Sequence, residues 1–346
     1  MNVLPNTYYY SHTDDNNRNI GLDIIAGILI IRMILGHYIS YAGCKDSFLF
    51  DSLNVLYFYM PWFFYKSGMF AHDANNRDAG KSYFIKEFKK LIIPYIAFTF
   101  WGLICSIIYE LVINSGCGLF KSVIHQCGGF LRYGYFSWSS HLWFLPSLFI
   151  CKCLYSIILY KWNKFFVATV SLLLAILHNK FISSTGFIGG GNLFSGLFFF
   201  TMGNILSDTQ YNKFWTITSI TIVSLIAFVR PSFVSMFSNV LQNNGLYVLW
   251  YPFCLGGIII INNLFRNISK ASIVYSTLGE VGRNSMSFYL SHFSIAVLAC
   301  KLYHYYKPNG NEWQLLCIMV ICAGIILPII ADILNKRKLK WIIGKI

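Results

Sequence analysis

One long apolar stretch of the chain contains three ionisable side chains, an acid, a guanidinium and an imidazole, which are able to bind charged ligands or to move a proton. The stretch runs from Asn19 to Ser40 and contains Asp23, Arg32 and His37. A charged group near the centre of a bilayer is costly, so an ionisable residue inside a membrane span is by default a candidate functional residue. His37 is the best candidate for proton transfer, because an imidazole titrates near neutral pH.

Helical geometry places two of these residues on one face. Asp23 and His37 are fourteen residues apart, which corresponds to about 40° around an α-helix and about 21 Å along its axis. Arg32 precedes His37 by five residues, so we expect it about 140° away, on another face. Each residue also has a structural interpretation. Asp23 suits a helix N-terminus, Arg32 can pair with a neighbouring helix or extend to the interface, and His37 can be a packing residue.

The composition indicates an integral membrane protein. Of 346 residues, 56% are hydrophobic and 12% are charged, whereas a soluble domain has about 25% charged residues. The mean hydropathy is +0.56. The net charge of +14 does not indicate a nucleic-acid partner, because the basic residues collect in loops between apolar segments. We therefore expect a multi-pass protein of the cell (inner or plasma) membrane, surrounded by the lipid bilayer.

We predict an all-α fold, a polytopic bundle of about ten transmembrane helices in a single domain, residues 1–346. The polar segment 1–18 argues against a cleavable signal peptide, and a basic tail, 335–346, follows the last span. The predicted spans are 21–40, 53–71, 90–113, 141–160, 164–179, 190–206, 213–229, 245–264, 284–304 and 314–334.

The distribution of lysine and arginine predicts the orientation. If the N-terminus is cytoplasmic, 17 of these residues fall on the cytoplasmic side, 7 on the other side and 3 inside spans. Cytoplasmic loops carry the excess of positive charge, so we predict that both termini are cytoplasmic. His37 then lies about 24 Å from the cytoplasmic end of its helix, in the outer half of the membrane.

Other candidate residues are expected at the same depth. Span four begins on the outer side with His141 and Trp143, and span three ends near Glu110. We therefore expect His37, Glu110 and His141 to approach one another in the outer half of the membrane. Taken singly, Trp143 also suits an interfacial anchor and Glu110 a helix-end charge.

The cytoplasmic side carries a basic cluster of Lys86, Lys89 and Lys90 just before span three, with Lys66 near the end of span two. This cluster either sets the topology and contacts anionic lipid, or binds the phosphates of a nucleotide-like donor. The ten cysteines lie mostly within spans without a C-x-x-C pair, so we predict no metal site. Cys117 and Cys127 share one loop and can pair if that loop faces away from the cytoplasm.

Five ordered segments resemble the acyltransferase-3 family of integral membrane O-acyltransferases. They are N-x-x-L-D…G-H (Asn19 to His37), FFYKSGMF (Phe63 to Phe70), KKLIIPY (Lys89 to Tyr95), HLWFLPSLF (His141 to Phe149) and GRNSMSFYLSHF (Gly282 to Phe293). The segments are spread over nearly the whole chain. The family has ten spans with both termini inside, which agrees with the organisation predicted above.

The resemblance implies transfer of an acyl group, usually acetyl from cytoplasmic acetyl-CoA, to a hydroxyl of a cell-envelope or exported glycan, including lipid-linked saccharides. It implies no bound cofactor, because acetyl-CoA or another acyl-CoA is a substrate. The histidine on which the family depends corresponds to His37. Eleven residues before it the family usually has Arg or Lys, and this chain has Ala26. The paired arginines before span three are reduced to Glu87 and Lys90.

In this interpretation His37 is either the general base or the residue that accepts the acyl group. Glu110 or Asp23 would orient its ring, although Asp23 lies too far along the helix for a direct bond. The candidates for oxyanion donors and acceptor contacts are Arg32, His141, Trp143, Tyr289, Ser291 and His292. Two alternatives stay open, a transporter or flippase of a lipid-linked saccharide and a catalytically degenerate family member. Buried ionisable residues disfavour a non-catalytic scaffold.

Overall fold

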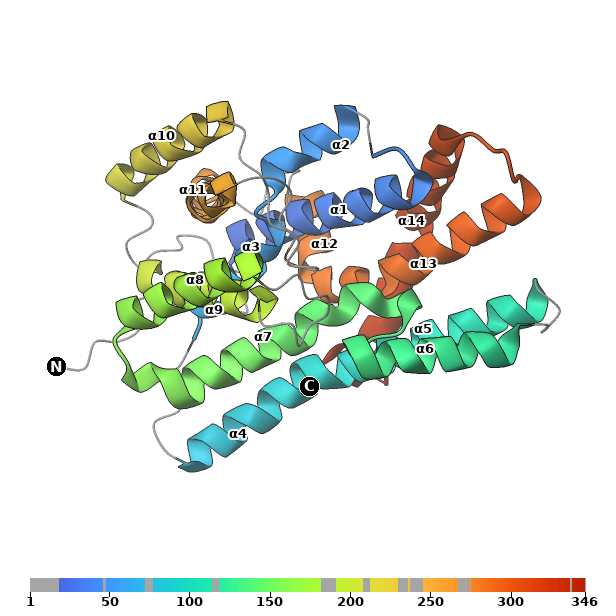
Figure 1. The fold of residues 1–346 in the computed structure, drawn as a ribbon, viewed down its shortest axis with the longest axis horizontal. Helices are drawn as coiled ribbons and strands as arrows, with labels where there is room; N and C mark the ends of the chain where they lie inside the picture. The colour runs from blue at the N-terminus through green and yellow to red at the C-terminus, as the bar shows by residue number, and fades with distance from the viewer. Residues whose placement is uncertain are drawn as a thin grey trace.

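The chain is described here by a computed structural model, in which residues 19–45, 48–71, 77–113, 118–181, 191–207, 212–229, 236, 245–266, 273, 275–336 and 338–345 are described. Within these ranges the chain forms helices and no strand, which confirms the predicted all-α class (Figure 1). The predicted polar segment 1–18 lies outside the described residues.

The α-helices are α1 (Ile20–Ala42), α2 (Phe48–Leu53), α3 (Tyr59–Met69), α4 (Arg77–Glu87), α5 (Ile93–Val112), α6 (Leu119–Tyr133), α7 (Phe144–Cys153), α8 (Lys164–Phe181), α9 (Gly191–Leu206), α10 (Lys213–Val229), α11 (Trp250–Leu264), α12 (Glu280–Arg283), α13 (Ser285–Tyr306) and α14 (Glu312–Asn335). Shorter 3-10 and π-helical segments join them: η2 (Asn54–Leu56), η3 (Phe88–Ile92), η4 (Ser137–Trp143), η5 (Leu154–Ile158), η6 (Leu159–Lys161), η7 (Gly245–Leu249), η8 (Tyr275–Gly279) and η9 (Lys340–Ile343).

Each of the ten predicted spans overlaps a helix in the described part of the chain. Six helical runs there are long and apolar enough to cross a membrane: Ile20–Ala42, Asp78–Val112, Ser137–Lys161, Leu246–Leu264, Ser285–Tyr306 and Glu312–Asn335. Leu193–Leu206 and Lys213–Val229 are apolar but shorter. The predicted span 53–71 is interrupted between η2 and α3. The total of about ten crossings therefore stays a prediction.

Helix α1 is the most deeply buried of these six runs, with 72% of its most apolar window inside the protein. The Asn19 side chain begins it by accepting a hydrogen bond from the Leu22 amide at 2.9 Å. Gly43 ends it in the left-handed conformation, with φ 88°. The helix contacts α12, α13, α14 and η8 (Figure 1). This burial keeps its ionisable side chains away from lipid.

Helices α3 and α9 cross at a pair of glycines. A β-carbon at Gly68 would lie 1.8 Å from the Phe200 carbonyl oxygen, and one at Gly203 would lie 2.0 Å from the Tyr65 carbonyl oxygen. The two backbones therefore touch without intervening side chains, as small residues allow in membrane helices. This crossing fixes the position of the FFYKSGMF segment.

Helices α4 and α5 form one continuous run through the π-helical turn η3, and this run carries a buried ion pair. Glu87 binds Lys152 of α7 at 2.6 Å, and their side chains are 5% and 13% exposed. A second π-helical turn, η5, follows Lys152 in the chain. Two buried charges are tolerated only when each one pairs with the other. Neither helix carries a sequence pattern that predicts this pair.

Helix α6 lies beside α5 (Figure 1) and was not predicted. The Gln126 amide anchors it by donating to the hydroxyls of Ser137 at 2.7 Å and Ser106 at 3.2 Å. Cys127 is exposed on this helix, and its proposed partner Cys117 lies outside the described residues.

The ends of α1, α13 and α14 meet in two places. At one side, Asn335 at the end of α14 donates to the Asn284 side chain before α13, with a distance of 2.9 Å. At the other side, Gly43 after α1 lies against Glu312 at the start of α14. Which side faces the cytoplasm stays a prediction from the positive charges.

The orientation can be tested with single cysteines at exposed lysine positions. Because basic residues divide 17 to 7, a membrane-impermeant maleimide applied to intact cells should label a cysteine at Lys121 and leave one at Lys161 unlabelled. The experiment uses a background in which the native exposed cysteines are replaced by serine. Labelling at position 161 with protection at 121 would reverse the predicted topology.

Candidate active site

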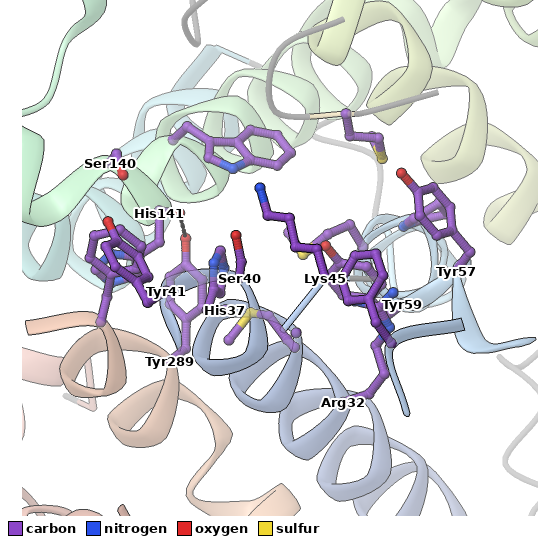
Figure 2. A pocket seen from close by; sticks show the side chains of 18 of the residues that line it. Arg32, His37, Ser40, Tyr41, Lys45, Tyr57, Tyr59, Ser140, His141 and Tyr289 are labelled. Carbon is purple, nitrogen blue, oxygen red and sulfur yellow. Dashed lines mark hydrogen bonds between the residues drawn. The ribbon is translucent and has the colours of Figure 1, made fainter. Parts of the chain in front are cut away.

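A pocket of about 510 Å³ lies beside the C-terminal half of α1 (Figure 2). Side chains from α1, α3, η4 and α13 line it, together with residues that follow α1. Its polar lining residues are Arg32, His37, Ser40, Tyr41, Lys45, Tyr57, Tyr59, Ser140, His141 and Tyr289. Aromatic rings of Trp143, Trp250 and Phe293 supply apolar surface. A concave site with this mixture of groups is able to orient a polar ligand.

His37 belongs to a cluster of three histidines, of which His37 and His141 line the pocket. Its ring centroid is 5.3 Å from that of His292. The His141 centroid is 4.9 Å from that of His292 and 4.7 Å from that of Phe293, on which the ring stacks. The structure thus brings together His37 and His141, and adds His292 from α13. In the described part of the chain, no three His, Cys, Asp or Glu residues are arranged to hold a metal ion.

His292 is fully buried and has a defined tautomer. Its Nδ1 lies 2.8 Å from the Tyr289 carbonyl oxygen and 3.2 Å from that of Phe288. A carbonyl oxygen only accepts hydrogen bonds, so Nδ1 carries the hydrogen and Nε2 of the neutral ring is an acceptor. Nε2 has no hydrogen-bond partner within the described ranges. It is therefore available to an N–H group of a neighbouring imidazole.

His141 is held at the cluster through its backbone. The Tyr289 hydroxyl donates a hydrogen bond to the His141 carbonyl oxygen, which links η4 to α13 (Figure 2). Two residues earlier the chain bends at Ser139, where φ is −134° and ψ is 21°. The His141 side chain is buried, and neither ring nitrogen has a hydrogen-bond partner among the residues described. Because buried polar atoms are normally paired, these nitrogens are candidates for ligand contacts.

Arg32 lines the same pocket as His37, contrary to the expectation from helical angles. Its Nε donates to the Leu53 carbonyl oxygen at 3.2 Å, and its guanidinium carbon lies 4.1 Å from the centroid of the Tyr59 ring. The angle fixes only where Cβ leaves the helix. The long side chain runs past Gly36, where a β-carbon would approach its Nη1 to 3.1 Å. The absence of a side chain at Gly36 gives Arg32 this path.

Four of the predicted catalytic and acceptor-site residues do not line the pocket: Asp23, Glu110, Ser291 and His292. Asp23 lies in the first turn of α1, at the opposite end of the helix from Ala42. Glu110 lies near the end of α5, beside Gly118. Ser291 is buried and donates to the Ser287 carbonyl oxygen at 2.7 Å. The expected carboxylate that would orient His37 is therefore not found among the described lining residues.

The predicted donor cluster is exposed on α4 and η3, and comprises Lys86, Lys89 and Lys90. Lys66 is on α3, with its Nζ 5.1 Å from the centroid of a Trp62 ring. Lys152, which was not predicted, interacts electrostatically with Lys86 and Lys90 as well as with Glu87. The cluster is accessible to a polyanion from solution.

Several lining residues were missed from the sequence, chiefly Ser40, Tyr41, Lys45, Tyr57, Tyr59, Ser140 and Trp250. A signal was present for four of them. The run YFYMPWFFY, residues 57–65, begins the second predicted span with aromatic side chains, and tyrosine and tryptophan favour the interface with water. Ser40 and Tyr41 extend the α1 face of His37 by about one turn.

Residues 19–343 match the acyltransferase-3 family model, which is described as an acyltransferase domain. This match covers nearly the whole chain and confirms the resemblance carried by the five motifs. Comparison with curated proteins and with solved structures gives no match. The matched region contains the apolar helices and the pocket described above. The chain therefore belongs to the acyltransferase-3 family of membrane acyltransferases.

Proposed function

We propose that this protein transfers an acyl group, acetyl from cytoplasmic acetyl-CoA, to a hydroxyl group of a cell-envelope or exported glycan. The observation that carries the proposal is a pair of adjoining pockets at the His37 cluster. The second pocket, of about 80 Å³, shares Met33, Met60 and Tyr289 with the larger one. It is also lined by Ser285 at the start of α13, which is the end predicted to face the cytoplasm.

Adjoining pockets suit a reaction between substrates that arrive from opposite sides of a membrane. The larger pocket offers hydroxyl, imidazole and aromatic groups to a glycan. The smaller one is lined mainly by apolar side chains, including Ile30, Phe63 and Phe144, and suits the acyl thioester end of a donor. Tyr289 contacts both pockets, so it marks the place where the two substrates would meet.

His37 is the proposed general base. A hydroxyl is a poor nucleophile until its proton is removed. His37 takes that proton while the hydroxyl oxygen attacks the thioester carbonyl carbon, the C–S bond breaks, and coenzyme A leaves as the thiol after the proton returns to sulfur. In the alternative mechanism His37 accepts the acyl group and then passes it to the glycan hydroxyl. His37 would occupy the same position between the two substrates.

The neighbouring histidines supply the remaining roles in this proposal. His292, whose Nε2 is a buried acceptor, orients the His37 ring where a carboxylate was expected. His141 has unused ring nitrogens and is the preferred donor to the oxyanion of the tetrahedral intermediate. The Tyr289 hydroxyl already donates to the His141 carbonyl, so its role is to hold His141 in place.

The basic cluster is the proposed site for the donor phosphates. Charge-assisted hydrogen bonds to phosphate are worth about 1.5–3 kcal/mol each, so a variant with Lys86, Lys89 and Lys90 all changed to Gln should raise the apparent KM for acetyl-CoA about tenfold or more. Lys81→Gln, an exposed lysine on the same helix, is the control and should leave KM unchanged. An unaltered KM in the triple variant would assign the cluster to lipid contact and topology.

The proposed reaction is tested by incubating the purified protein in nanodiscs with radiolabelled acetyl-CoA and glycan from the producing cells. Label in base-labile ester linkage on the glycan supports the proposal. A flippase of a lipid-linked saccharide would move the saccharide across a vesicle membrane without consuming acetyl-CoA. A catalytically degenerate member would neither acylate nor translocate it.

A further inference from the structure

The larger pocket carries positive charge without a matching acid. Arg32 and Lys45 are the lysine and arginine residues among the described residues that line the pocket, and none of the described lining residues is Asp or Glu. Lys45 is exposed in the segment after α1, and Figure 2 shows its side chain extending across the pocket. Glu312 approaches Gly43 and does not line the pocket. The pocket is therefore electrostatically suited to an anion.

Arg32 is the more informative of the two cations because it is only 6% exposed. Its Nε bond to the Leu53 carbonyl is its one hydrogen bond within the described ranges. The rings of Tyr59 and Tyr57 lie 4.1 and 5.7 Å from the guanidinium carbon. A cation–π contact uses the face of the guanidinium, not its N–H edge. The paired Nη groups, whose geometry matches carboxylate and phosphate, are left for a ligand.

A buried charge without an ionic partner is costly. Aromatic rings offset part of the cost for Arg32, but they carry no countercharge. An anionic group on the substrate would supply the missing partner. The substrate that enters this pocket in the proposed reaction is the acceptor glycan.

We infer that the acceptor is an acidic glycan. Its carboxylate or phosphate group binds the paired Nη groups of Arg32, and the exposed Lys45 attracts the same anionic group to the pocket. This inference rests on the proposed acyl transfer. Arg32 and His37 are five residues apart on one helix, about 7.5 Å along its axis. That spacing suits an acid group and a reactive hydroxyl on the same sugar or on adjacent sugars.

The native acceptor provides the first test. Membranes from cells that make wild-type protein or His37→Gln are incubated with radiolabelled acetyl-CoA, and the saccharide that is labelled only with wild type is freed of any lipid carrier. Anion-exchange chromatography at neutral pH should retain this saccharide, and mass spectrometry then distinguishes carboxylate from phosphate. A labelled but neutral saccharide would overturn the inference and leave the proposed function intact. Absence of labelled saccharide with the wild-type protein would overturn the proposed function itself.

Variants provide the second test, measured as acceptor KM and kcat. Arg32→Gln should raise the acceptor KM about tenfold or more, because it removes a bidentate charged contact. Arg32→Lys should restore part of the affinity, and Lys45→Gln, at an exposed position, should raise KM in a salt-dependent way. The control is Lys301→Gln, a cation 4.6 Å above the Tyr109 ring and outside the pocket.

A different pattern would contradict the inference. If Arg32→Gln lowers kcat with the acceptor KM unchanged, Arg32 acts on the oxyanion and not on the acceptor. If Lys45→Gln behaves like Lys301→Gln and Arg32→Gln leaves both constants unaltered, the pocket charge has no role in acceptor binding. Size-exclusion profiles that match wild type establish that each variant is folded.

Discussion

The His37→Gln variant is expected to insert and purify normally and to transfer no measurable acyl group. A positioned general base contributes about 10²–10⁴-fold in rate, and glutamine cannot accept the hydroxyl proton. Glutamine keeps much of the imidazole volume and its hydrogen-bonding capacity, so packing against His292 and Phe293 should survive. The rate of ester formation from radiolabelled acetyl-CoA is the measurement.

Two further variants make this experiment decisive. His304→Gln changes an exposed histidine on α13 whose Nδ1 contacts the Cys300 carbonyl, and it should retain full activity. His37→Ala should be inactive as well as less stable. Near-normal turnover in His37→Gln would remove His37 from the mechanism. If both His37 variants are missing from the membrane, His37 is a packing residue and the reacting base is to be sought at His141 or His292.

Substitution of Gly68 by alanine should destabilise the protein although it adds a single methyl group. The new β-carbon would meet the Phe200 carbonyl oxygen at 1.8 Å, and a backbone atom cannot move aside as a side chain does. Overpacking of this kind costs about 1–3 kcal/mol. Helices α3 and α9 would then separate, so both the thermal unfolding temperature in detergent and the acyl transfer rate should fall.

The matched control is Gly324→Ala on α14. A β-carbon at Gly324 has no atom within 4 Å, and alanine favours a helix over glycine by about 1 kcal/mol. This variant should unfold at the wild-type temperature or slightly above it. Equal unfolding temperatures for Gly68→Ala and Gly324→Ala would show that the α3–α9 contact is looser than described.

The helices were predictable from the sequence because length and hydropathy are properties of single segments. Segments that depend on contacts with their neighbours are not predicted in this way. Helix α6 is shorter than a span and has polar residues such as Gln126, whose partners Ser106 and Ser137 come from other elements. The helical run is interrupted at Tyr57 and Phe58, and neither position is a proline or glycine that would predict a break. Packing between elements therefore decides these features.

The sequence predicted the depth of each site residue in the membrane, and the site was predictable only as far as that depth locates a residue. Depth predicted that His37 and His141 would lie at one level, and the structure places both at one pocket. Glu110 was expected beside them and does not line the pocket. Residues at the same depth can lie on different sides of a helix bundle, so depth alone does not predict contact. Arg32 was assigned to another face, since helical angles describe Cβ and not the end of a long side chain. The Glu87–Lys152 pair joins two helices and has no signature in either one.

The burial of α1 has a consequence for the order of synthesis. This helix is the first of the described helices to leave the ribosome, yet α12, α13 and α14, which contact it, are the last of the described α-helices to follow. Until they insert, Asp23 and His37 would face lipid or the insertion machinery, where ionisable groups are costly. Contacts so distant in sequence form slowly. The His37–His292 pair therefore forms only after α13 has been translated, and chains that stop before α13 lack it.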